Sequence, residues 1–115
     1  MKARLLTIVC LGLFAAGAAH AANPEAGKEK SRTCAACHGP DGNSASGDFP
    51  RLAGQHYDYL VKALKDYKAG KRKNPIMAPQ VANLSARDME DIAAFYSHNQ
   101  GLVTRKNPYL VHSGK

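Results

Sequence analysis

The chain contains 115 residues, which is enough for one domain. It carries 16 Lys and Arg residues against 9 Asp and Glu residues, for a formal net charge of +7 with neutral histidines. We find no internal repeat or low-complexity tract, which excludes repeat architectures and compositionally biased chains.

Residues 1–21 have the pattern of a cleaved secretory signal peptide. Lys2 and Arg4 provide a charged start, an uncharged apolar stretch continues to Ala18, and an Ala-His-Ala cleavage site ends at residue 21. The stretch is short for a membrane span, although a retained anchor is the alternative. Cleavage removes two of the 16 basic residues and no acidic one, so the net charge falls from +7 to +5. We therefore expect a periplasmic protein that does not bind nucleic acid and is not inserted in the membrane after cleavage.

The elements predicted for the remaining 94 residues are all helical. A first helix runs from Pro24 to about Thr33, because proline suits a first turn and basic residues gather toward the helix end. Apolar residues recur at helical spacing in the range 55–69 and predict a second helix. A last helix begins at Ser85, where the sequence to Asp88 resembles a capping box, and it stops near residue 101.

Two segments between these helices are predicted to be loops. Residues 39–54 contain several Gly, Pro, Asp, Asn and Ser residues without apolar periodicity. Residues 71–79 contain two prolines and show no helical period. Long loops in a compact domain commonly carry function, so a binding site is expected beside them. Residues 101–115 are predicted to form an extended or loosely docked tail.

The run Cys34-Ala35-Ala36-Cys37-His38 is a C-x-x-C-H sequence, the attachment signal for a c-type haem. Two thiols at positions i and i+3 of a helical turn reach the two vinyl-derived carbons of one porphyrin edge and bind them as thioethers. The histidine that follows is then held under the iron as its proximal ligand. The sequence therefore predicts one haem c, bound through Cys34 and Cys37 with His38 on the metal.

Two other kinds of site use the same residue types. A thioredoxin-like C-x-x-C motif follows a strand and opens a helix, but no alternating strand pattern lies near residue 34. A structural zinc site needs four ligands, and no second ligand pair follows the motif. The mature chain also has few large apolar residues, so a haem would supply much of its core and act as a folding ligand.

The residue on the other face of the iron decides between an electron carrier and an open haem site. Met77 lies between two prolines of the 71–79 loop, 39 residues after His38, and is the preferred sixth ligand. Met89 lies on the periodic face of the last helix, where methionine usually fills a core. His56 is the histidine alternative. A thioether ligand favours ferrous iron and keeps small molecules from the metal.

Four segments together resemble class I cytochromes c, in particular the small bacterial periplasmic monohaem form. They are Cys34-Ala-Ala-Cys-His38-Gly, Phe49-Pro50-Arg-Leu52-Ala-Gly54-Gln, Met77-Ala-Pro79 and Ile92-Ala-Ala-Phe95-Tyr96. The same fold makes up each half of certain two-haem cytochromes. The resemblance implies an all-α fold over residues 22–100, with three main helices and long loops around one haem, whereas the tail 101–115 departs from the usual ending.

The resemblance also assigns roles to single residues. The Pro50 carbonyl is implied to accept a hydrogen bond from the His38 ring, and Leu52 to pack against the porphyrin. Gly27 and Tyr96 would mark the crossing of the first and last helices, with Phe95 as the alternative contact. A glycine within a helix costs about 1 kcal/mol relative to alanine, so a packing reason is credible.

The function implied is that of a soluble one-electron carrier rather than an enzyme. Its partners would be redox proteins, such as membrane respiratory complexes or periplasmic reductases and oxidases. The alternatives are a haem subunit of a larger periplasmic dehydrogenase complex, or a peroxidase or gas-binding protein with an exchangeable sixth ligand. A group of basic residues would either orient an acidic partner or keep the surface soluble. The group comprises Lys62, Lys65, Lys68, Lys71, Arg72 and Lys73.

Overall fold

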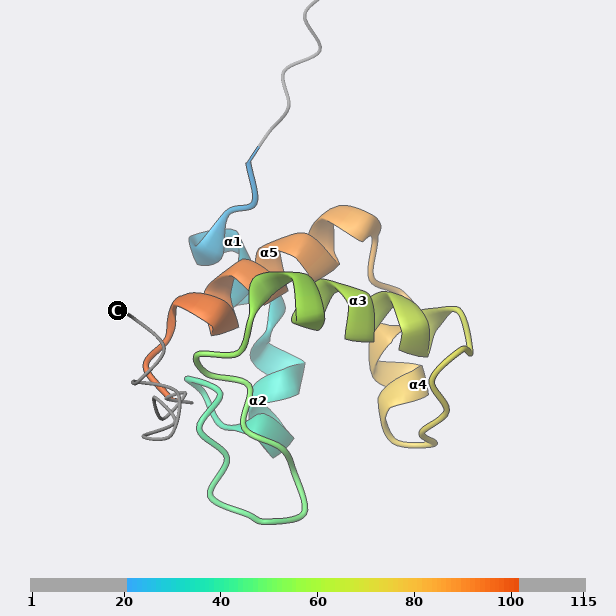
Figure 1. The fold of residues 1–115 in the computed structure, drawn as a ribbon, viewed down its shortest axis with the longest axis horizontal. Coiled ribbons are helices and arrows are strands. Elements are labelled where there is room, and N and C mark those ends of the chain that lie inside the picture. The colour runs from blue at the N-terminus through green and yellow to red at the C-terminus, as the bar shows by residue number, and fades with distance from the viewer. Residues whose placement is uncertain (1–20, 102–115) are drawn as a thin grey trace, which may run out of the picture.

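Helices and connecting loops, without a strand, make up residues 21–101, the part of the chain described by this computed structural model (Figure 1). The helices are α1 (Pro24–Lys30), α2 (Arg32–His38), α3 (Tyr57–Lys68), α4 (Met77–Val81) and α5 (Ala86–His98). None of these helices is long and apolar enough to cross a membrane. The all-helical prediction is confirmed. The predicted signal peptide (1–21) and tail (101–115) lie outside the described residues, except for residues 21 and 101.

The N-terminal helix begins where the sequence predicts but ends earlier. The Asn23 side chain accepts hydrogen bonds from two backbone amides of the first turn, and Pro24 follows it. The buried Ser31 then separates α1 from α2, and its hydroxyl donates to the Lys28 carbonyl at 2.9 Å. A serine that bonds to its own preceding turn competes with regular helix geometry. The prediction of one helix to Thr33 is therefore wrong at this break.

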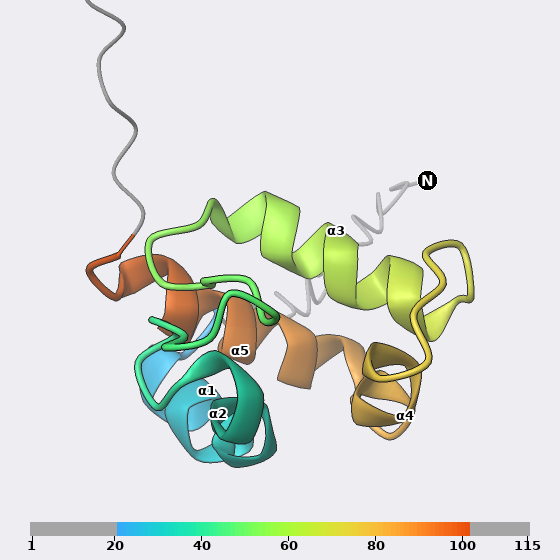
Figure 2. The same cartoon turned by 90° about the horizontal axis from the view of Figure 1, so that it is seen from below.

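Helix α5 lies between α1 and α3 (Figure 2). Its start at Ser85 has the predicted capping box, in which the Ser85 side chain bonds the Asp88 amide and the Asp88 side chain bonds back. Its buried apolar residues are Met89, Ile92, Ala93, Ala94 and Tyr96, and Asp91 is buried with them. Helix α3 agrees with the predicted range and contributes Leu60 to the same core. Figure 2 shows α3 along one side of α5, with α1 and α2 on the other.

The segment before α5 contains a short helix that the sequence did not predict. Residues 71–79 are predicted to be a loop, but α4 starts at Met77 and includes Pro79. The Asn74 side-chain oxygen accepts hydrogen bonds from the Ile76 and Met77 amides at 2.9 and 3.0 Å and so initiates the turn. Pro79 lies in the first turn, where its missing N–H has no helical partner to lose. The loop prediction is therefore wrong from Met77 onward.

A buried carboxylate ties the start of the domain to α5. The Asp91 side chain is 3% exposed and contacts the Lys30 ammonium at 2.7 Å and the Arg87 guanidinium at 3.1 Å. It also accepts a 2.8 Å hydrogen bond from the Asn23 amide. Burial by itself raises the pKa of Asp91, but the Asn23 amide and the two cations outweigh it and leave this pKa below its ordinary value. The charged form is thus the one that links α1 to α5.

Helices α1 and α5 touch backbone to backbone at Gly27. A Cβ atom at this position would lie 1.9 Å from the Asp91 carbonyl oxygen and 2.9 Å from the Phe95 Cβ atom. The predicted partner Tyr96 is therefore wrong, and the alternative contact, Phe95, is the one found. Tyr96 instead packs over Gly42, where an added Cβ atom would meet its ring at 2.6 Å.

We expect Gly27→Ala to destabilise the domain by about 1–3 kcal/mol, because the new methyl group overlaps a backbone carbonyl that cannot rotate away. The matched control is Gly47→Ala, since an added Cβ atom there has no neighbour within 4 Å. Its effect should stay within about 0.5 kcal/mol. Denaturant unfolding of the purified haem-loaded protein measures both, and equal effects of the two variants would contradict the close crossing.

Candidate haem-binding site

A cavity of about 520 Å³ lies within the domain, and α2, α3, α4, α5 and the loop before α3 all contribute to its wall. This volume is within the usual range for small-molecule and cofactor sites. The six residues predicted to bind the haem all line it: Cys34, Cys37, His38, Pro50, Leu52 and Met77. Residues up to 43 positions apart in sequence thus meet at one site.

Helix α2 presents the attachment motif to the cavity. Cys34 and Cys37 are half-buried, form no disulfide, and share one face of the helix because they are three residues apart. Burial raises the pKa of the Cys34 thiol above its ordinary value. His38 is the last residue of α2 and is 6% exposed. Gly39 follows with a φ of 84°, a left-handed conformation that glycine adopts easily and that turns the chain away from the helix.

A hydrogen bond orients the His38 ring. Its Nδ1 atom lies 2.8 Å from the Pro50 carbonyl oxygen. A carbonyl only accepts, so Nδ1 carries the proton and donates, and Nε2 keeps its lone pair for a metal. The Phe49 ring packs edge-on beside the imidazole, with ring centroids 6.3 Å apart. Two consecutive residues of the loop before α3 therefore hold both the tautomer and the orientation of the ring.

Met77 reaches the cavity from a different element. It is the first residue of α4 and is half-buried, and both views show α4 well separated from α2 (Figures 1 and 2). The two alternatives weighed for the sixth ligand do not line the cavity. Met89 is buried on α5 at 3% exposure, whereas His56 is exposed at the start of α3.

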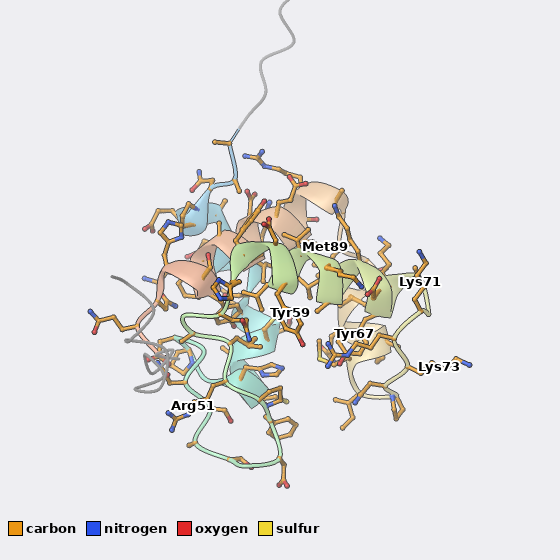
Figure 3. The ribbon with its side chains drawn as sticks, viewed as in Figure 1. Arg51, Tyr59, Tyr67, Lys71, Lys73 and Met89 are labelled. Atoms are coloured by element: carbon orange, nitrogen blue, oxygen red, sulfur yellow. The ribbon has the colours of Figure 1, made fainter. Side chains whose placement is uncertain are left out.

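A cluster of residues that no sequence pattern indicated lies at the cavity. Tyr59, Tyr67, Arg72 and Asn74 also line it. The Arg72 guanidinium lies 3.4 Å from the Tyr59 hydroxyl and 4.7 Å from the centre of the Tyr67 ring. Figure 3 shows both tyrosines extending from the same side of α3. Tyr67 lay on the predicted inner face of its helix, but no sequence signal paired either ring with an arginine of the next loop.

The cavity wall has the chemistry that a c-type haem needs. Apolar side chains from α3, α5 and the preceding loop line it, namely Leu52, Leu60, Leu64, Ile92 and Ala93. Two thiols and an oriented imidazole lie on one element, and a thioether lies on another. Imidazole nitrogen and thioether sulfur are the axial donors of low-spin c-type haem iron. The residues present therefore fit a haem, which Cys34 and Cys37 would hold covalently.

These features define a small helical protein with one covalently attached haem. Residues 15–100 match the family described as Cytochrome c, and the chain belongs to that family. Haem c is the cofactor of the family, and the single C-x-x-C-H motif of this chain accounts for one.

Relatives of known sequence and structure agree with this assignment. The chain is 43% identical over 113 residues to cytochrome c4 of Pseudomonas aeruginosa, covering 97% of this chain and 56% of that protein. It is 41% identical over 83 residues to cytochrome c-554(548) of Halomonas halodenitrificans, covering 70% of this chain and 100% of that protein. The structure of reduced recombinant cytochrome c4 from Pseudomonas stutzeri matches with a TM-score of 0.68 and 46% identity, over 72% of this chain and 48% of that one.

Two facts follow from these matches. The helices have the class I cytochrome c fold, as the sequence predicts. The chain spans about half the length of the cytochrome c4 proteins that it matches.

We expect protein without haem to lose cooperative folding, because the core of the described residues is small. Among residues 21–101, the large side chains with less than 2% exposure are those of Tyr96 and Val81. The double substitution Cys34→Ala/Cys37→Ala removes both attachment points and should abolish the cooperative thermal transition, measured by circular dichroism and calorimetry. A haem-free variant that stays compact and unfolds cooperatively would show that the polypeptide core suffices.

Proposed function

We propose that this chain is a one-electron carrier whose haem iron is bound by His38 Nε2 and the Met77 sulfur. The observation that carries the proposal is the meeting of both side chains at one cavity, with the His38 Nδ1 proton already engaged by Pro50. A haem with these ligands supplies one-electron oxidation and reduction of its iron. The proposal concerns this chain alone, because the matched cytochrome c4 proteins are about twice as long.

The chain's own residues would set the conditions for that chemistry. The Pro50 carbonyl increases electron donation from the imidazole by accepting its Nδ1 proton in a hydrogen bond. Leu52, Leu64 and Ile92 line the cavity and would keep water from the haem, which would stabilise the less charged reduced state. Met77 would bind the iron and leave no open site for a small molecule. These roles favour electron transfer over peroxide or gas chemistry.

The first test is spectroscopic. A reduced-minus-oxidised visible spectrum with a pyridine haemochrome assay should report one haem c per chain. Met77→Ala should then abolish the weak near-infrared sulfur-to-iron band of the ferric protein and allow carbon monoxide to bind the ferrous protein. Met89→Leu is the matched control, because it also removes a thioether but from the core, and it should keep the band. Ready binding of carbon monoxide by the unmodified protein would contradict the carrier function.

We further propose that the protein acts in the periplasm. The support is the pattern of residues 1–21, with a charged start, an apolar stretch and an A-x-A site. The cytochrome c domain would then occupy residues 22–100, with residues 101–115 as a tail. Mass spectrometry of the exported protein tests this proposal, because cleavage after Ala21 should leave Ala22 as the first residue.

The partners proposed are redox proteins with an acidic docking face. The support is the basic group on α3 and the loop after it, of which Arg72 also lines the cavity. Some of its members have other contacts: Lys62 pairs with Asp66, and the Lys68 ammonium bonds to the Leu84 carbonyl. The remaining lysines, Lys65, Lys71 and Lys73, are exposed. Electron-transfer rates to an acidic redox protein should fall steeply with added salt, and a flat response would leave solubility as their role.

A further inference from the structure

The segment that joins α3 to the Met77 helix has little apolar anchorage. From Gly70 to Ile76, every residue except Asn74 is exposed, and Ile76 is 55% exposed. No apolar side chain of this segment is buried against other protein side chains, and Ile76 faces the cavity instead. The contacts that the segment makes directly with α3 are therefore polar or aromatic, and their identity is important for the site.

Arg72 makes the main side-chain contacts between this segment and α3. Its guanidinium lies 3.4 Å from the Tyr59 hydroxyl and 4.7 Å from the centre of the Tyr67 ring. Its backbone amide donates to the Asp66 carbonyl at 3.1 Å. Figure 3 shows the neighbouring Lys71 and Lys73 extending away from the domain instead. A planar guanidinium suits this place, because it bonds a hydroxyl and stacks on an aromatic face at once.

Short-range hydrogen bonds connect Asn74 to the residues that begin α4. The Asn74 side chain accepts from the Ile76 and Met77 amides, and the Asn74 carbonyl accepts from the Ala78 amide at 3.0 Å. The start of α4 is therefore built directly on Asn74, two residues after Arg72. A displacement of Arg72 from α3 would be carried along this turn to Met77.

We propose that Arg72 is a positioning residue that latches the Met77 segment to α3 and thereby keeps the Met77 sulfur in the cavity. The inference rests on the proposed function, in which Met77 is the sixth ligand. An added ligand can occupy that position only when Met77 has left it. The apparent affinity for such a ligand therefore measures the fraction of molecules in which the segment has opened.

The experiment compares two single-charge removals at adjacent residues of the haem-loaded protein. Arg72→Gln removes the contacts to both tyrosines, whereas Lys71→Gln removes one positive charge from an exposed neighbour. Imidazole is titrated into each ferric protein and followed by visible spectroscopy. Arg72→Gln should bind imidazole roughly three- to tenfold more tightly than the unmodified protein, the size expected for losing one cation–π contact and one weak hydrogen bond. Lys71→Gln should bind it within about twofold of the unmodified protein.

A conservative variant distinguishes the proposed positioning role of Arg72 from a general loss of packing. Arg72→Lys keeps the cation near the Tyr67 ring but loses the planar fork, so its imidazole affinity should lie between those of Arg72→Gln and the unmodified protein. The near-infrared sulfur-to-iron band should weaken in the same order. Equal imidazole affinities for Arg72→Gln and Lys71→Gln would contradict the proposed role of Arg72. Any difference from the unmodified protein would then come from the loss of a positive charge.

Failure of the latch differs from failure of the proposed function. If the unmodified ferric protein lacks the near-infrared band, Met77 is not its ligand, and both proposals fall. If that band is present and Arg72→Gln changes neither the band nor imidazole binding, only the latch is wrong. Because Arg72 is exposed, we expect its variants to fold, and thermal unfolding of each variant is measured alongside.

Discussion

The direct contact between α1 and α5 at Gly27 organises the rest of the domain. With no side chain between them, the two backbones approach to a distance that any Cβ atom would block. Helix α2 continues from α1 after the break at Ser31, so the crossing also places the attachment motif relative to α5. Helix α3 packs on the other side of α5. The distance between the opposite walls of the cavity therefore depends on how closely one glycine lets two helices meet.

The core and the cofactor site of this protein are largely the same set of residues. Leu60, Ile92, Ala93 and Tyr96 form the buried cluster, and all four also line the cavity. A ligand in the cavity packs against these core side chains and therefore stabilises the folded state. A reversibly bound ligand does so by mass action, whereas a covalently attached one does so permanently. Folding and cofactor attachment are thus coupled. A substitution that alters the proposed redox site would therefore also alter the stability of the fold.

Local patterns in the sequence predicted the parts of the fold that local chemistry determines. The cap at Ser85, the proline at the start of α1 and the periodic face of α3 each depend on neighbours in sequence, and each is present. The start of α4 was missed because the prolines at 75 and 79 and the lack of a helical period indicated a loop, although Pro79 is accommodated in the first turn of the helix. The cluster of Arg72 with Tyr59 and Tyr67 was missed for a different reason. Its members belong to different elements, and only the packed chain brings them together.

The acceptor for the His38 proton is a main-chain atom, and this affects how the site tolerates mutation. Every residue type at position 50 would present a carbonyl oxygen, so no substitution there removes the acceptor itself. What proline adds is a restricted φ angle, which limits the directions in which the chain through residues 49–51 can run. Substitutions at position 50 would therefore alter the geometry of the hydrogen bond gradually and would not remove its acceptor. The orientation of the imidazole is robust to loss of a side chain and sensitive to the path of the backbone.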